Sequence, residues 1–337
     1  MKVGDLPTPA LVVDAEAFAY NLDTMAAALP GPRLRPHVKA HKTTALAREQ
    51  HARGHHTFTC ATPREVLGMA RAGMGDDVLL ANQCLDANRL RALADSGARV
   101  TVAVDSGATI IAAAANGIRE VLIDVNVGMP RCGCPPDEAG RLADAARAAG
   151  LEVRGVMGYE GHVVGLEDAT ERSAQTRAAM DCLEVAHKLA GGDVISAGGT
   201  GTYAINTYAT EIQAGSYALM DNAYDALALP FKRALAVVAT VIHANAKFAV
   251  ADCGLKALAM DHGNPSMTGA DVWFCSDEHV TFAPHAPVAP GDRVFVWAAH
   301  VDPTIAKHDR MHLATAIDPD AEVVDSWPVD LRGWDVS

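Results

Sequence analysis

The sequence predicts an α/β protein in which a parallel (β/α)8 TIM barrel is followed by a β-rich C-terminal domain. Short apolar runs alternate with Ala-, Leu- and Arg-rich segments of helical period over roughly the first 220 residues, a length typical of such a barrel. Runs such as VLIDVN lack a strict polar alternation, as expected for strands buried on both faces of a parallel sheet. Later runs are rich in Val and are separated by Gly and Pro.

The barrel is predicted from eight strand-like runs with helical segments between most of them. The strands are expected at 33–38, 57–61, 77–82, 100–105, 121–126, 153–159, 194–198 and 212–220. Helices are expected, for example, at 64–72, 86–95, 136–149 and 169–189. An open, doubly wound sheet with the same alternation is the alternative.

The second domain is predicted from strand-like runs with few helical segments between them. These runs are 234–244, 247–251, 279–282, 293–298 and 312–317. We therefore expect residues 1–225 to form the barrel and residues 226–337 to form the second domain. An early run at 8–14 precedes the first barrel strand and is a candidate to join the second domain.

Composition excludes several classes of protein. The 337 residues include 28 Lys and Arg against 41 Asp and Glu, a formal net charge of −13, which argues against nucleic acid or an anionic membrane as the main partner. No apolar run reaches the roughly 18 residues that a membrane span requires, and the N-terminus lacks the apolar stretch of a signal peptide. Seven scattered cysteines indicate reduced thiols, so we expect a cytoplasmic protein.

Polar and glycine-rich clusters follow four of the predicted strands. They occupy 39–42, 128–131, 158–162 and 197–203. Because the loops after the strands of a (β/α)8 barrel gather at one end, these clusters predict a single composite site.

The glycine-rich cluster GGTGTY at 198–203 directly follows a strand. Consecutive glycines let backbone N–H groups approach an anion, and Thr200 or Thr202 can add a hydroxyl donor. The segment is neither a phosphate-binding G-x-x-x-x-G-K-[ST] loop nor a clean dinucleotide motif, so it fits a monophosphate best. The alternative is a turn that needs glycine for its backbone angles.

A basic cluster, RPHVKAHK at 35–42, ends the first predicted strand. A lysine held among other cations is a better amine nucleophile and can form a Schiff base, and Lys39 at the strand's end is a better candidate than Lys42. The alternative is a solvated basic loop.

His300 and Asp302 follow the run 293–298. In an extended chain these two side chains project to the same side, which is the minimal arrangement for a divalent-metal site with open positions. The alternative is a hydrogen-bonded surface pair.

Taken together, these segments resemble a known family. R-P-H-V-K-A-H-K, G-x-P-R-C-G, G-Y-E-G-H, G-G-T-G-T-Y, E-I-Q-A-G-S-Y-x-x-M-D, S-D-E-H and H-x-D occur in that order over most of the chain. The chain is similar to the D-threonine aldolase and D-serine dehydratase-like family of fold-type III pyridoxal 5'-phosphate (PLP) enzymes, which are related to alanine racemase. The resemblance implies a barrel plus a β-domain, PLP as cofactor, an amino-acid substrate and a homodimer.

The resemblance also implies roles for individual residues. Lys39 resembles the lysine that forms the Schiff base with PLP, Arg131 the arginine facing the phenolic oxygen, and Tyr159 a tyrosine lining the cofactor ring. His162 is the candidate base. The remaining assignments are His37 as a cofactor-binding residue, Gly199, Thr200, Gly201 and Thr202 as the phosphate cradle with Ser216 and Tyr217 as helpers, and His300 and Asp302 as metal ligands.

The metal pair tilts the expected reaction towards an aldolase. Dehydratase members of the family resemble H-x-C, a zinc site, whereas Asp302 is a hard carboxylate that favours Mn²⁺ or Mg²⁺ over Zn²⁺. We therefore expect cleavage of D-3-hydroxy amino acids to glycine and an aldehyde. The alternatives are a D-serine or 3-hydroxyaspartate dehydratase, an amino-acid racemase, a non-catalytic PLP carrier and, more remotely, a non-PLP barrel enzyme acting on phosphorylated sugars.

Overall fold

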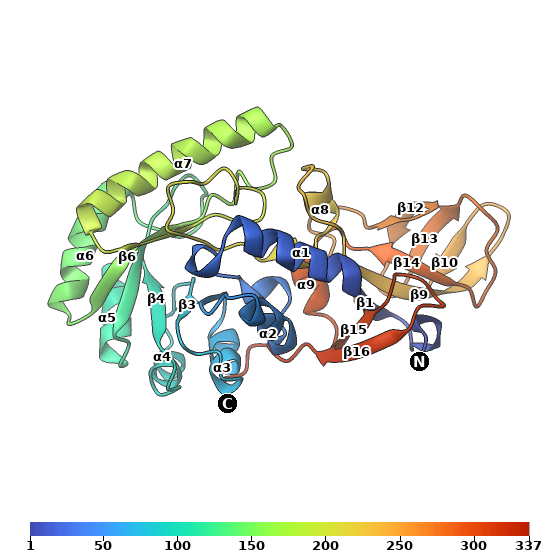
Figure 1. Ribbon diagram of the computed structural model, residues 1–337, viewed down its shortest axis with the longest axis horizontal. Coiled ribbons are helices and arrows are strands. Elements are labelled where there is room, and N and C mark those ends of the chain that lie inside the picture. The colour runs from blue at the N-terminus through green and yellow to red at the C-terminus, as the bar shows by residue number, and fades with distance from the viewer. Residues whose placement is uncertain (337) are drawn as a thin grey trace. The chain divides into compact units, whose positions relative to one another are not determined.

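The computed structural model describes residues 1–336 and divides them into two compact units (Figure 1). Unit 1 comprises Met1–Thr24, Ala40–Ala45 and Ser216–Asp330. Unit 2 comprises Met25–Lys39, Leu46–Gly215 and 331–336. Among the described residues, no helix has both the length and the apolar character needed to span a membrane.

Unit 2 is built on a seven-stranded parallel sheet whose strands follow one another in chain order. The strands are β2 (Phe58–Cys60), β3 (Val78–Leu80), β4 (Val100–Val104), β5 (Glu120–Asp124), β6 (Glu152–Gly158), β7 (Val194–Ala197) and β8 (Glu211–Ile212). The helices between them are α3 (Pro63–Arg71), α4 (Ala87–Ala94), α5 (Gly107–Ala115), α6 (Ala139–Ala148) and α7 (Ala169–Ala190). The predicted alternation of parallel strands and helices is confirmed.

The helices of unit 2 begin where the sequence provides capping side chains. Thr62, Asp86 and Asp168 each accept backbone N–H groups from the first turn of α3, α4 and α7. Ser106 and Thr109 form a reciprocal capping box at the start of α5. These caps satisfy N–H groups that have no partner within the helix.

The segment predicted as the first strand, 33–38, is not a regular strand. Leu34 forms one parallel bridge to Ile212 of β8, and His37 forms one to Thr59 of β2. Pro36 lies between them and has no N–H to donate, so a continuous ladder cannot form. The segment nevertheless hydrogen-bonds to both edge strands of the sheet.

The last predicted barrel strand, 212–220, is also wrong over most of its length. Strand β8 ends at Ile212, and a 3-10 turn, η5 (Ser216–Ala218), follows it. Ala218, Leu219 and Met220 are buried. The sequence is therefore apolar here because these side chains pack in the interior, although they do not belong to a strand. A short buried turn and a short buried strand have the same apolar pattern in sequence.

Unit 1 contains a nine-stranded sheet in the order β10-β13-β12-β11-β14-β9-β1-β15-β16. Its strands are β1 (Ala10–Asp14), β9 (Leu235–Ala244), β10 (Ala249–Ala251), β11 (Ser266–Met267), β12 (Ala270–Cys275), β13 (Val280–Pro284), β14 (Arg293–Trp297), β15 (Arg310–Ala314) and β16 (Val323–Pro328). The predicted β-rich C-terminal part is confirmed. Strand β1 pairs antiparallel with β9 and parallel with β15.

The core of unit 1 gathers around this early strand. Val12 of β1 packs in a buried cluster with Val3, Leu6, Val238 and Ala314. Two short helices, α8 (Asn222–Asp225) and α9 (Val301–Ile305), complete the C-terminal part of the unit. Among the described residues, the remaining α-helices are α1 (Ala15–Ala28) and α2 (Thr44–Ala52).

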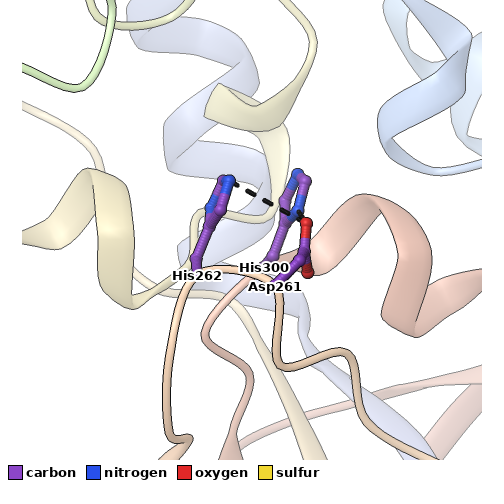
Figure 2. A group of neighbouring side chains, drawn as sticks. All are labelled: Asp261, His262 and His300. Carbon is purple, nitrogen blue, oxygen red and sulfur yellow. Dashed lines mark hydrogen bonds and ion pairs between the residues drawn. The ribbon is translucent and has the colours of Figure 1, made fainter.

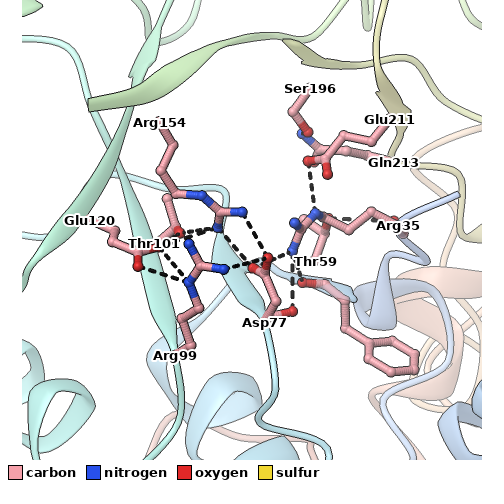
Figure 3. Close-up of polar contacts among 11 residues, drawn as sticks. Arg35, Thr59, Asp77, Arg99, Thr101, Glu120, Arg154, Ser196, Glu211 and Gln213 are labelled. Carbon is pink, nitrogen blue, oxygen red and sulfur yellow. Dashed lines mark hydrogen bonds and ion pairs between the residues drawn. The ribbon is translucent and has the colours of Figure 1, made fainter. Parts of the chain in front are cut away.

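A buried network of ion pairs centres on Asp77, directly before β3 (Figure 3). Arg154 of β6 binds both carboxylate oxygens of Asp77 at 2.9 and 2.8 Å, and Arg35 binds one of them at 3.0 Å. Arg35 also donates to Glu211 at the start of β8, at 2.7 Å. The network therefore joins the segment 34–37 to β3, β6 and β8.

The electrostatics of Asp77 follow from these contacts. Burial alone would raise the pKa of Asp77, but the hydrogen bonds and charges of Arg154 and Arg35 outweigh burial and lower the pKa to about 2. Arg35 is almost completely buried, so its guanidinium depends on these carboxylates for compensation.

We expect Asp77→Asn to lower the free energy of unfolding by about 3–5 kcal/mol at neutral pH, because it leaves two largely buried guanidiniums without their shared carboxylate. Exposed Asp76 gives the matched control, and Asp76→Asn should change stability by less than about 0.5 kcal/mol. Denaturant unfolding curves measure both values. Equal stabilities of the two variants would contradict the assigned role.

A comparison of Asp77→Asn with the parent protein tests the pH dependence of stability. The lowered pKa means that Asp77 stabilises the fold fully above its ordinary value near 3.8 and that this contribution is lost as pH falls to about 2. Asp77→Asn should therefore lose less stability than the parent protein between those two pH values.

Candidate active site

Lys39 lies in a 3-10 turn, η3 (Val38–Ala40), at the end of the interrupted segment. The backbone N–H of Lys39 donates to Nδ1 of His37 at 3.4 Å, so His37 helps to shape this turn. The Lys39 ammonium lies 5.6 Å from the centroid of the Tyr159 ring, and Tyr159 directly follows β6. This aromatic face is a favourable place for a cation.

Arg131 approaches the same aromatic ring from a different loop. The guanidinium carbon of Arg131, in the loop after β5, lies 5.6 Å from the Tyr159 ring centroid. Two predicted site cations therefore lie beside one predicted aromatic residue, although Lys39 comes from η3 and Arg131 from the loop after β5. A site with an amine, a guanidinium and an aromatic face fits a planar anionic ring such as that of PLP.

The expected crowding of cations around Lys39 does not involve Arg35. The Arg35 guanidinium is paired with Asp77 and Glu211 at the starts of β3 and β8, so its charge is compensated there. Arg131 supplies a second cation at Tyr159 instead.

Hydrogen bonds to Glu160, a residue of the same unit, hold the glycine-rich loop after β7 in place. This fully buried carboxylate accepts the Gly198 N–H at 3.1 Å and the Thr202 hydroxyl at 2.8 Å. Thr202 in turn accepts the Gly199 N–H at 3.1 Å. The Thr202 hydroxyl therefore holds the loop in shape, a role that differs from the anion donor expected from sequence.

Glycine is required at position 201 of this loop because the backbone of Val164 approaches it closely. A Cβ atom at 201 would lie 1.8 Å from the Val164 carbonyl oxygen. A Cβ at 199 would lie 3.3 Å from Val164 and 3.5 Å from the Tyr159 ring. The loop thus passes beside the ring that also faces Lys39 and Arg131, which fits a phosphate attached to a planar ring.

His162 belongs to the loop after β6 and is exposed. Its ring lies against Gly128, where an added Cβ would be 2.8 Å from the imidazole. Gly128 has a φ of +127°, a backbone conformation that favours glycine at this position.

Asp124, at the end of β5, is an ionisable residue that sequence reasoning missed. Burial raises its pKa to about 6, and the nearby charge of Asp105 adds to this effect, while a 2.6 Å hydrogen bond from Gln83 opposes it. The loop carrying Arg131 returns to this strand end, where the Cys134 N–H donates to the Asp124 carbonyl at 2.9 Å. A carboxyl group that titrates near pH 6 therefore lies at the base of the Arg131 loop.

The predicted metal pair lies in unit 1. His300 has an extended backbone, but Asp302 lies in the first turn of α9, so the expectation of one extended segment is wrong. Asp302 and Pro303 are both favoured in a first helical turn, which explains the helix. Even so, His300 Nε2 and Asp302 Oδ1 are 3.9 Å apart, close enough to be bridged by one ion after small adjustments.

Ser216 and Tyr217 also belong to unit 1, in η5. The Ser216 hydroxyl donates to Asp302 Oδ1 at 3.4 Å, so this side chain contacts a predicted metal ligand. The Tyr217 ring is completely buried, with its centroid 5.7 Å from that of Phe231.

Two residues next to His300 were not found from sequence: Asp261 and His262 (Figure 2). Asp261 Oδ2 lies 2.6 Å from His300 Nδ1, and the His262 and His300 rings stack with centroids 4.0 Å apart. Partial burial would raise the pKa of Asp261, but the hydrogen bond and charge of His300 outweigh it and lower the pKa. The consecutive D-H pair was the only sequence signal.

Asp221 supports the backbone between His300 and Asp302, the predicted metal ligands. It is buried, and its Oδ2 accepts the N–H of Val301, the residue between His300 and Asp302, at 3.0 Å. Burial raises the pKa of Asp221 and the nearby charge of Asp302 adds to the rise, although two backbone N–H groups and His300 oppose it.

The chain matches two known family profiles. Residues 13–223 match the alanine racemase N-terminal domain, and residues 234–314 match the putative serine dehydratase domain. The two matches are consecutive and together cover most of the sequence.

Individual relatives align over nearly the full length. The 3-hydroxy-D-aspartate aldolase of Paracoccus denitrificans (strain Pd 1222) is 32% identical over 99% of this chain and 94% of its own. The D-threonine aldolase of an Arthrobacter species is 32% identical over 97% of this chain and 93% of its own. Among solved structures, the D-threonine aldolase of Filomicrobium marinum has a TM-score of 0.92 and 33% identity, and the alignment covers 98% of this chain and 97% of that one.

These matches confirm the resemblance inferred from the motifs. Because they extend across both the N-terminal and the C-terminal parts, the chain belongs to the D-threonine aldolase and D-serine dehydratase-like family, with an N-terminal domain of the alanine racemase type.

Proposed function

We propose that the protein is a PLP- and divalent-metal-dependent aldolase that cleaves D-3-hydroxy amino acids to glycine and an aldehyde. The observation that carries the proposal is that Lys39 and Arg131 both lie beside the Tyr159 ring. It is supported by aldolases that align with the chain over nearly its full length. In the balanced reaction the Cα–Cβ bond breaks, the hydroxyl proton leaves as the aldehyde forms, and a proton is added at Cα.

Unit 2 would hold the cofactor. Lys39 would bind it covalently, Tyr159 would cover its ring, Arg131 would face the phenolic oxygen, and His37 would support the turn that carries Lys39. When bound, PLP supplies an electron sink for the carbanion left at Cα. The residues of this chain orient the bond to be broken and control the protons.

The phosphate would lie at the glycine-rich loop. Gly199, Thr200 and Gly201 contribute close backbone approach, and Thr202 keeps the loop in shape through Glu160. Ser216 and Tyr217 remain proposed helpers from the following turn.

His300 and Asp302 would hold the divalent metal. One imidazole nitrogen and one carboxylate oxygen are suited to Mn²⁺ or Mg²⁺, with Zn²⁺ as the alternative, and leave positions for water and substrate. When bound, such an ion lowers the pKa of a coordinated hydroxyl group. His162 is the proposed base that takes the proton from the 3-hydroxyl oxygen.

A dehydratase is the second candidate, because the C-terminal part matches the putative serine dehydratase domain. The dehydratase reaction removes the 3-hydroxyl as a leaving group, for which the family resemblance implies H-x-C and zinc. Asp302 in place of that cysteine favours the aldolase. A racemase needs no metal, and the His300–Asp302 pair therefore argues against it.

The aldehyde half of the substrate is open among threonine, phenylserine and 3-hydroxyaspartate. A 3-hydroxyaspartate substrate would need a further cation for its second carboxylate. Arg33 already donates to the Ala209 carbonyl, and Arg310 is exposed on β15 with a 3.5 Å contact to the Ser326 carbonyl. Neither contact indicates that Arg33 or Arg310 is the cation that a dicarboxylate substrate would need.

The finer architecture is also part of the proposal. We propose that the segment 34–37 takes the place of an eighth strand, so that unit 2 is a closed (β/α)8 barrel; its bridges to β2 and β8 support this. A functional division near residue 225 is supported by the two consecutive family matches. We further propose a cytoplasmic homodimer.

Covalent attachment at Lys39 can be tested directly. Borohydride reduction of the PLP-loaded protein should fix the cofactor to Lys39, which peptide mass spectrometry detects. Lys39→Arg should abolish this attachment and the aldolase activity, because a guanidinium does not form the Schiff base. Lys42→Arg is the matched control and should retain both, whereas cofactor fixed to Lys39→Arg protein would refute the assignment.

Glu160→Gln tests the support of the glycine-rich loop. The neutral amide still accepts a hydrogen bond but loses the charge-assisted contacts to the loop, worth roughly 1 kcal/mol, so PLP should bind about fivefold more weakly. Exposed Glu167→Gln is the control and should bind PLP normally. A fluorescence titration of the apoprotein with PLP measures both, and equal affinities would contradict the role of Glu160.

A further inference from the structure

Asp261 contacts His300, a proposed metal ligand, and no family match assigns a role to Asp261 (Figure 2). The Asp261 carboxylate lies 2.6 Å from His300 Nδ1. On the other side of the same ring, Nε2 lies 3.9 Å from Asp302 Oδ1. The two nitrogens of His300 therefore face two different carboxylates.

Asp261, His262 and His300 bring their ligand atoms within 4.8 Å of one another, which raises the question of a three-residue metal site. The ring geometry argues against it. The two imidazoles are stacked with an angle of only 8° between their planes. Because ring nitrogens bind metals in the plane of the ring, the lone pairs of the two stacked rings lie in nearly parallel planes and do not converge on one ion.

A hydrogen bond explains the Asp261 contact better. An ionised carboxylate can only accept, so Nδ1 of His300 must carry the proton in this bond. In a neutral imidazole the other nitrogen, Nε2, then has the free lone pair. That lone pair is on the side of Asp302.

We propose that Asp261 is a positioning residue that holds His300 in its Nδ1–H form, so that Nε2 is the atom that binds the divalent metal together with Asp302. This inference rests on the proposed function, because it assigns a role to Asp261 within the proposed metal site. Metal-binding histidines commonly donate their second N–H in this way, and the partner improves both ring orientation and basicity.

The rest of the local structure fixes the backbone of His300 but not its ring. Asp221 accepts the N–H of Val301 at 3.0 Å, and Thr304 donates its hydroxyl to the His300 carbonyl at 2.7 Å. Rotation of the imidazole is therefore left to Asp261 and to stacking with His262. The Asp261 side chain is 51% exposed, so its replacement leaves no buried unpaired group and should not unfold the protein.

The protonated nitrogen can be read without metal. In the ¹⁵N-labelled, metal-free, PLP-loaded protein at about pH 8, where histidine is ordinarily neutral, long-range ¹H–¹⁵N spectra distinguish Nδ1–H from Nε2–H, with His300→Ala identifying the signal. We expect Nδ1–H in the parent protein and a shift towards Nε2–H in Asp261→Ala. An Nε2–H form in the parent protein, or identical forms in both, would overturn the proposal.

Metal affinity provides the second readout. Electron paramagnetic resonance measures the free Mn²⁺ that remains when the metal-free protein is titrated with this ion. We expect Asp261→Ala to bind Mn²⁺ about 10–100-fold more weakly than the parent protein. Asp261→Asn, which can still accept the Nδ1 proton, should recover part of that loss. His262→Ala is the matched control, because it removes the stacked ring and keeps the hydrogen bond; its affinity should change less than about threefold.

The variants separate failure of this inference from failure of the proposed function. If His300→Ala loses the Mn²⁺ site while Asp261→Ala binds normally, the positioning role is overturned and the proposed metal site survives. If His300→Ala binds Mn²⁺ normally, the proposed metal site itself is wrong, and the role of Asp261 falls with it. Equal losses in Asp261→Ala and His262→Ala would overturn the proposal in favour of a three-residue metal site.

Discussion

The arrangement of unit 2 depends on the ion pairs that the Asp77 carboxylate forms with two arginines. This carboxylate joins Arg154 of β6 to Arg35, four residues before Lys39. Pro36 prevents the segment 34–37 from forming a continuous ladder, so the side-chain contacts of Arg35 replace part of the missing backbone pairing. The N-terminal ends of the strands thus carry a buried ion network, while the loops after the strands carry Lys39, Arg131 and Tyr159. This separation of stability and chemistry is expected for a parallel α/β architecture.

Periodicity in the sequence predicted most of the strands and helices of unit 2, and the positions of polar loops predicted that Lys39, Arg131 and Tyr159 would meet. The prediction of strands from periodicity failed at three places: at Pro36, at the buried turn after Ile212, and in the first turn of α9. There, tertiary contacts and local backbone preferences override the apolar pattern. Glu160 and Asp261 were missed because their partners are distant in sequence, 42 residues away for Thr202 and 39 for His300. No local pattern encodes such pairs.

The sequence correctly predicted that His300 and Asp302 lie close together, but from an incorrect expectation of one extended segment. His300 and Asp302 do approach each other, but a helix start brings them together, with Asp221 holding the peptide between them. Asp261 then adds a second carboxylate to His300. Each acid near His300 therefore has a distinct role. Asp302 is the proposed metal ligand, Asp221 supports the backbone, and Asp261 is the proposed acceptor for the Nδ1 proton of His300.

The most direct test of the central claim is product analysis with a panel of D- and L-3-hydroxy amino acids, with and without EDTA. The proposed aldolase should release glycine and an aldehyde in equal amounts from D-substrates only. EDTA should abolish this release, and Mn²⁺ or Mg²⁺ should restore it. Release of ammonia and a 2-oxo acid, a metal-independent change of configuration at Cα, or full activity in EDTA would contradict the account.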